Sequence, residues 1–148
     1  MTEVDRVRGE VQKYLQNNFD VIELHGEAFF VRSGSTGVDI TVAAWGKSDV
    51  MIRLSSLVLS DVERNDEFYI ELGKRSGVHI FGNLHAIPNE DERTCCLYFE
   101  HNLLGTTLDE GELMWALSAL AQTADEMDDE LQALFGGKRL IDGRGDES

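Results

Sequence analysis

The sequence has only two cysteines and one proline, and it has no long apolar run. Cys95 and Cys96 are adjacent. Neighbouring residues of a strand point to opposite faces, so no structural disulfide is expected between them. A transmembrane helix needs about 20 consecutive apolar residues, and the charged N-terminus MTEVDRVRGE does not resemble a secretory signal. We therefore expect a cytoplasmic protein that does not bind or cross membranes.

Basic residues are also scarce, with 13 Lys and Arg against 28 Asp and Glu and a net charge of −15. Such a charge argues against binding to nucleic acids and anionic membranes, which are themselves negative. It is compatible with a basic or amphipathic partner, and equally with an acidic surface that only contacts water. The length of 148 residues fits one domain with a proper core.

Motifs of nucleophilic catalysis and nucleotide binding are missing. Ser55 and Ser56 are not part of a Gly-x-Ser-x-Gly elbow, and no strand-helix-strand unit contains a Gly-rich turn. His101 is expected on the same strand as the two cysteines, roughly 16 Å along it, so it cannot serve as their base. We expect structural cysteines and no enzymatic activity.

Metal ligands are present only as weak candidates. Asp125, Asp128 and Asp129 are spaced i, i+3 and i+4, but no calcium-binding loop or Glu-x-x-His pair accompanies them. A solvated acidic face explains them better. The alternative is a small metal-binding regulator or enzyme that uses His79, His101 and these helix carboxylates. We expect no metal and no cofactor.

The strongest local pattern predicts a long helix over residues 107–137. Thr107 and Glu110 form the pattern of a capping box, and two glycines allow the turn that ends a helix. Asp128 belongs to the acidic surface opposite the apolar stripe, so Asp128→Asn is expected to cost little. The stripe permits a coiled-coil seam, but packing on a sheet is favoured. Its apolar residues follow one another at steps of three and four: Leu113, Leu117, Leu120, Ala124, Met127, Leu131 and Leu134.

The remaining periodicities predict an α+β fold with the order α-β-β-β-α-β-β-α. The first helix begins with a Thr2–Asp5 cap, and Gly9 inside it weakens the helix or marks a close contact. The elements cover a helix at 2–18, strands at 27–32, 38–44 and 50–55, a helix within 60–77, and strands at 78–84 and 94–101. The strands form one five-stranded antiparallel sheet packed by the N- and C-terminal helices. The domain covers 1–137, and 138–148 is a flexible tail.

The second and third strands have apolar residues on both faces, so one face is available to a partner. Trp115 lies off the main helix stripe, either exposed or in a second internal stripe with Ala119 and Gln122. Exposed Trp and Met often mark interfaces. The candidate partner-binding surface consists of Ala43, Trp45, Met51, Arg53 and Trp115.

Several local strings resemble the small domain shared by type III secretion chaperones and YbjN-type proteins, especially its actinobacterial branch. They are SSLVLSDV (55–62), FEHNLLG (99–105), LDEGEL (108–113), AQTAD (121–125), DDEL (128–131) and FGG (135–137). The resemblance covers residues 3–137. It implies a helix-sheet sandwich without enzymatic activity, usually a homodimer, that binds an extended client segment on apolar patches. We expect a module that binds a protein or peptide.

Overall fold

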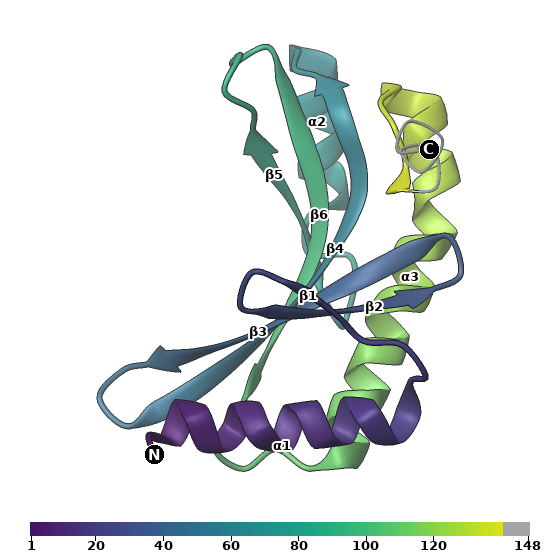
Figure 1. Cartoon of the computed structure of the whole chain (residues 1–148). Helices are drawn as coiled ribbons and strands as arrows, with labels where there is room; N and C mark the ends of the chain where they lie inside the picture. The colour runs from purple at the N-terminus through teal and green to yellow at the C-terminus, as the bar shows by residue number, and fades with distance from the viewer. Residues whose placement is uncertain (141–148) are drawn as a thin grey trace.

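Within residues 1–140, the part that the computed structural model describes, the chain forms three helices and six strands (Figure 1). All six strands belong to one antiparallel sheet with the order β1-β2-β3-β4-β6-β5. The elements are α1 (Glu3–Asn18), β1 (Glu23–His25), β2 (Ala28–Ser33), β3 (Thr36–Trp45), β4 (Asp49–Glu63), α2 (Asp66–Arg75), β5 (Asn83–Pro88), β6 (Thr94–Leu104) and α3 (Glu110–Phe135). The predicted α+β class and the terminal helices are confirmed.

The sheet has one strand more than the five predicted from the sequence. Gly26, with a φ of 64°, turns the chain so that β1 pairs with β2 as a short hairpin. Strand β4 also continues to Glu63 and so enters the segment 60–77, within which a helix was predicted. Buried Val58, Leu59 and Val62 keep this end of the strand in the sheet.

The strand predicted over 78–84 is wrong in position, because β5 begins only at Asn83. Gly82 has a φ of 94°, a conformation that favours glycine, and a Cβ there would overlap the ring of Phe99. The chain therefore approaches Phe99 closely and changes direction. Val78 and Ile80 before it are exposed instead of lying in a strand.

The cap predicted for α1 agrees with the structure, whereas the cap predicted for α3 does not. The Thr2–Asp5 capping box of α1 is confirmed, and the side chain of Asn65 caps α2. For α3 the predicted Thr107 cap is wrong, because Asp109 accepts the backbone N–H of Glu112 at 2.8 Å. A methyl group added to Gly9 would meet no heavy atom within 4 Å, so this glycine does not mark a close contact.

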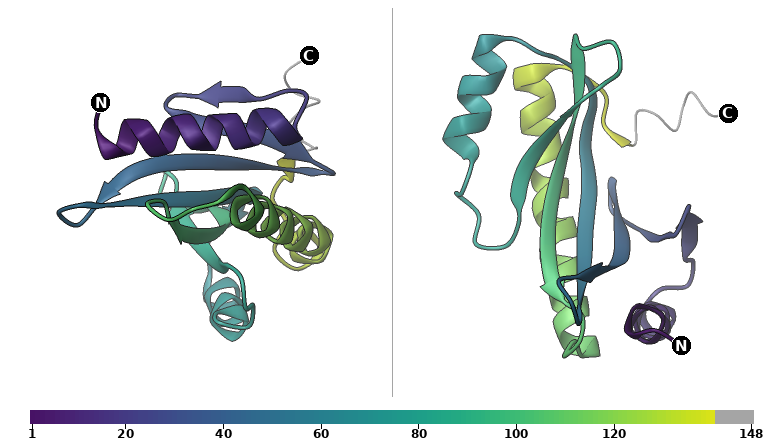
Figure 2. Two further views of the ribbon diagram at one scale, coloured as in Figure 1. Left: turned by 90° about the horizontal axis from the view of Figure 1, so that it is seen from below. Right: turned by 90° about the vertical axis from the view of Figure 1, so that its left-hand side faces the viewer.

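The core lies between the sheet and the helices α1 and α3 (Figures 1 and 2). Because the strands twist strongly, α1 packs under the β3–β4 hairpin while α3 packs along the middle of β4. The predicted stripe of α3 is buried at Leu113, Leu117, Leu120, Ala124, Met127 and Leu131. Leu134 is 52% exposed, so its predicted burial is wrong.

Asp128 is not part of the acidic outer surface, and that prediction is wrong. It is only 4% exposed, and the hydroxyl of Ser35 lies 2.8 Å from its Oδ2. Asp125 accepts the backbone N–H of Ser35 at 2.9 Å and also contacts its hydroxyl. The β2–β3 turn is therefore fastened to α3 by two carboxylates.

The end of the domain is ordered slightly beyond the predicted boundary. Lys138 pairs with Ser60 through backbone hydrogen bonds of 2.7 and 2.8 Å. Residues 141–148, most of the predicted tail, lie outside the described residues. The flexible tail stays a prediction.

Candidate functional site

One edge of the sheet is incompletely paired at the end of β6. β5 pairs with β6 only as far as Asn83, which lies opposite Glu100. β4 continues along β6 to the pair Met51–Leu104. Within residues 1–140, segment 101–104 thus pairs with a strand on one side only; we call it the free edge of β6. In an antiparallel strand the N–H and C=O groups of every second residue point outward, so this edge offers backbone hydrogen bonds.

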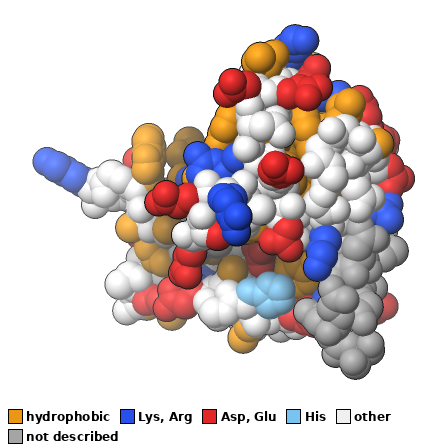
Figure 3. Space-filling view, turned by 90° about the horizontal axis from the view of Figure 1, so that it is seen from above, with side chains coloured by type: hydrophobic (Ala, Val, Ile, Leu, Met, Phe, Trp, Pro, Cys, Tyr) orange, Lys and Arg blue, Asp and Glu red, His pale blue; other side chains and the backbone are white. Residues whose placement is uncertain are grey.

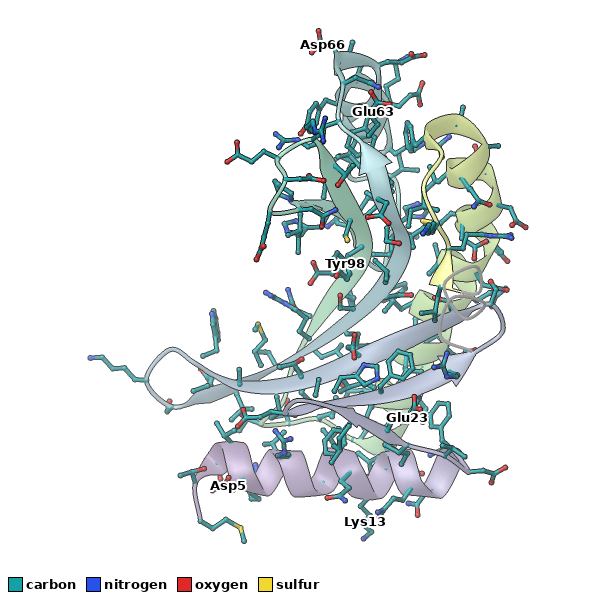
Figure 4. All side chains as sticks on the ribbon, turned by 45° about the horizontal axis from the view of Figure 1, so that its top comes forward. Asp5, Lys13, Glu23, Glu63, Asp66 and Tyr98 are labelled. Carbon is teal, nitrogen blue, oxygen red and sulfur yellow. The ribbon has the colours of Figure 1, made fainter. Side chains whose placement is uncertain are left out.

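The sheet face opposite α1 and α3, here the open face, lies beside this edge. The register places Ala43 opposite Met51 and Met51 opposite Leu104. Arg53 lies between Thr41 and Asn102 on the same face. With Trp45, four of the five predicted partner-binding residues therefore share this face, and Tyr98, labelled in Figure 4, continues it along β6.

A cavity of about 250 Å³ on this face, the open-face pocket, is lined by Trp45, Met51, Asn102, Leu103 and Leu104. Trp45 and Leu104 are 55% and 59% exposed, so two large apolar side chains of the pocket are accessible to solvent. In Figure 3 apolar side chains gather beside the β3–β4 hairpin, which projects to the left. The pocket is an apolar depression directly beside the free edge.

Arg53 contacts Asn102, one of the residues that line this pocket. Its Nε donates to Asn102 Oδ1 at 3.2 Å and lies 3.6 Å from a carboxylate oxygen of Glu100. These contacts of Arg53 are therefore with the neighbouring strand of the same sheet.

Trp115, the fifth predicted residue, lies on the opposite side of the sheet. It is 60% exposed, so it does not belong to a second internal stripe. With Phe81, His101 and Glu112 it surrounds a cavity of about 430 Å³, the aromatic pocket, which is completed by Leu103, Gly111 and Ala116. Leu103 lines both pockets, which places one pocket on each side of the free edge.

The rings of the aromatic pocket meet edge to face. The Phe81 and Trp115 centroids are 4.7 Å apart at an angle of 71°, and the Phe81 and His101 centroids are 5.6 Å apart at 73°. Burial lowers the pKa of His101, so its imidazole is neutral at pH 7. Among residues 1–140, the Glu112 carboxylate has no hydrogen-bond or ion-pair partner.

The structure does not favour the metal-binding alternative. No group of three or more His, Cys, Asp or Glu side chains within 1–140 is arranged to hold a metal ion. His79 packs against the ring of Phe99 with centroids 5.1 Å apart, whereas His101 packs against Phe81. Cys95 is buried, and burial raises the pKa of its thiol, as expected for a structural cysteine.

Phe81, Asn102 and Leu104 line the two pockets but were not predicted from the sequence. Phe81 lies within 78–84, which was predicted as a strand, whereas the structure has a turn at Gly82 and a contact between Phe81 and Trp115. The free edge is a property of strand pairing and has no local sequence pattern. The exposed apolar residues before Gly82 were the only available signal.

The family can be assigned from a comparison with known proteins. A family model described as "T3SS (YopN, CesT) and YbjN peptide-binding chaperone 1" matches residues 4–143. The chain belongs to this family. The predicted resemblance, placed at residues 3–137, is thereby confirmed, and the family supports a chaperone-like module that binds peptides. A search of curated proteins found no match.

The described part of the chain has no helix that is both long and apolar enough to cross a membrane. The longest helix, α3, contains the acidic residues Asp125, Asp128 and Asp129 within its second half. It is amphipathic, with one side in the protein core.

Proposed function

We propose that this protein is a non-enzymatic module that binds an extended segment of a client polypeptide along the free edge of β6. The observation that carries the proposal is the one-sided pairing of residues 101–104, with a pocket on each side. Strand addition of this kind obtains affinity from main-chain hydrogen bonds and specificity from pockets for alternate side chains. The family description as peptide-binding chaperones supports it.

The two pockets fit the geometry of an added strand. Successive side chains of a strand point to opposite faces. One side chain of the client would enter the open-face pocket beside Trp45 and Met51, and the next would enter the aromatic pocket beside Trp115. In this proposal Ala43 and Arg53 border the bound segment on the open face.

The edges formed by β1 and β5 are less suited to such a segment. β1 contains three residues, Glu23–His25, all exposed, and offers a short edge. β5 ends at Pro88, which has no backbone N–H to donate. The free edge of β6 is instead flanked by apolar surface on both faces.

The test is a binding titration with a fluorescein-labelled peptide, Thr-Thr-Leu-Arg-Leu-Thr-Thr-amide, followed by fluorescence polarisation. A version with N-methylated leucine amides has the same side chains but cannot form the main-chain ladder. We expect saturable binding of the first peptide and a loss of at least about tenfold in affinity for the second, since 1.4 kcal/mol corresponds to a factor of ten. Equal affinities would exclude strand addition.

A matched pair of variants locates the binding surface. Trp45→Ala removes a 55% exposed side chain from the open-face pocket and should weaken binding about tenfold or more. Ile70→Ala removes a 60% exposed apolar side chain from α2, at the other end of the sheet in Figure 1, and should leave binding unchanged. Equal effects of both would contradict the proposed location.

The family resemblance also predicts a homodimer, and the sequence predicts a cytoplasmic location. We retain both as parts of the proposal. Sedimentation equilibrium across a concentration range tests the first: a mass twice that of the 16.6 kDa chain supports it, and a constant monomer mass contradicts it. Fractionation of the native cells tests the second.

A further inference from the structure

We infer that the aromatic pocket binds a lysine or arginine side chain of the client, so that the client segment alternates apolar and basic residues. The inference rests on the proposed function, because the side chain reaches the pocket from a strand paired with the free edge of β6. It adds the chemical class of the residue that is recognised.

The rings provide a face for a cation. Trp115 is 60% exposed and Phe81 is 37% exposed, so part of each ring is accessible from the pocket. Phe81 meets Trp115 and His101 edge to face, and these three rings form adjoining walls of one cavity. A cation held within about 6 Å of an aromatic centroid is attracted by the negative face of the ring, most strongly by tryptophan.

The charges around the pocket favour the same class of side chain. Glu112 precedes Trp115 by three residues on α3, so both lie on the same side of the helix. Its carboxylate is not compensated by a basic residue of the described part, and no Lys or Arg lines the pocket. His101 is neutral at pH 7 because burial lowers its pKa, so it does not repel a cation.

The length and form of the pocket suit a long side chain. Of the residues that line the cavity of about 430 Å³, Ala116 is buried and Leu103 is half-buried, whereas Glu112 is exposed. Lys and Arg place an apolar stem along such a surface and keep the charge near water. The net charge of −15 also attracts basic segments over a distance at low ionic strength.

The experiment compares two nearly isosteric peptides on the full chain. One is the peptide Thr-Thr-Leu-Arg-Leu-Thr-Thr-amide, and the other has citrulline in place of arginine, which removes the charge and retains the shape. We expect the arginine peptide to bind about tenfold more tightly, an advantage that decreases with added salt. Equal affinity of the two peptides would overturn the inference.

Three variants test whether the higher affinity for the arginine peptide arises in the aromatic pocket. Trp115→Leu keeps an apolar wall but removes the best ring, and Glu112→Gln removes the charge at constant size. Each should reduce the ratio of arginine to citrulline affinities, whereas Trp115→Phe should retain most of it. An unchanged ratio in Trp115→Leu and Glu112→Gln would show that the cation is bound elsewhere and contradict the inference.

The outcomes separate this inference from the proposed function. If both peptides bind equally and N-methylation abolishes binding, strand addition holds and the cation pocket is wrong. If neither peptide binds, the proposed function is wrong and the inference fails with it. If N-methylation has no effect while the arginine peptide still binds more tightly than the citrulline peptide, strand addition is wrong and the acidic surface alone attracts the peptide.

Discussion

The burial of α3 can be tested with two leucines that the sequence does not distinguish. Leu120 and Leu134 belong to the same apolar stripe, but Leu120 is fully buried and Leu134 is 52% exposed. Leu→Ala in a core loses the transfer energy of the removed atoms and leaves a cavity, together about 3 kcal/mol. At Leu134 water can occupy the released space, so the cost should be below about 1 kcal/mol.

The assay is urea unfolding, followed by both tryptophan fluorescence and far-ultraviolet circular dichroism. Leu120→Ala should lower the midpoint strongly with an unchanged slope, and about 3 kcal/mol corresponds to a fall in Tm of roughly 6–12 °C in a domain of this size. Leu134→Ala should stay close to wild type. Similar losses in the two variants would mean that α3 does not lie on the sheet as described.

Two other contrasts use matched residues. Gly9→Ala should stabilise the protein by up to about 1 kcal/mol, because Gly9 lies inside α1 with open space around it. Gly82→Ala should destabilise it, because Gly82 has a φ of 94° and an added Cβ would overlap with Phe99. Thermal unfolding that ranks the two variants in the opposite order would refute this. Asp125→Asn and Asp128→Asn should differ in their dependence on pH, measured by urea unfolding between about pH 3 and 7. The hydrogen bond from Ser35 lowers the pKa of Asp125, so its stabilisation is present above about pH 4 and is lost in acid, and the cost of Asp125→Asn should shrink there. Burial raises the pKa of Asp128, so this carboxyl makes the wild type less stable as the pH rises from about 4 through the raised pKa. Over that range the stability of Asp128→Asn should therefore increase relative to that of the wild type. Parallel pH profiles of the two variants would contradict the assignment.

The features that the sequence predicted correctly depend on local physics. The periodicity of α1 and α3 and the Thr2–Asp5 cap require only residues within a turn or two. The alternation of β3 likewise marks which side faces the core. These patterns were sufficient for the fold class and the terminal helices.

The errors arose where a distant residue decides the outcome. Asp128 reads as a surface carboxylate on its helix, but Ser35, more than ninety positions earlier, meets it in the fold. Trp45 and Trp115 each carried an apolar signal, yet only strand pairing shows that they lie on opposite sides of one edge. The gap in pairing beyond Asn83 has no counterpart in the order of residues.

The most direct measurement is amide hydrogen exchange of the protein by NMR, with and without the arginine peptide. If a client strand pairs with β6, the outward-pointing amides among residues 101–104 should become protected when the arginine peptide is added. The same amides should stay unprotected when the N-methylated peptide is added instead. Residues 41–45 of β3 pair with β4 but lie beyond the pairing with β2. Protection confined to β1 or to these residues, or none at saturating peptide, would contradict the account.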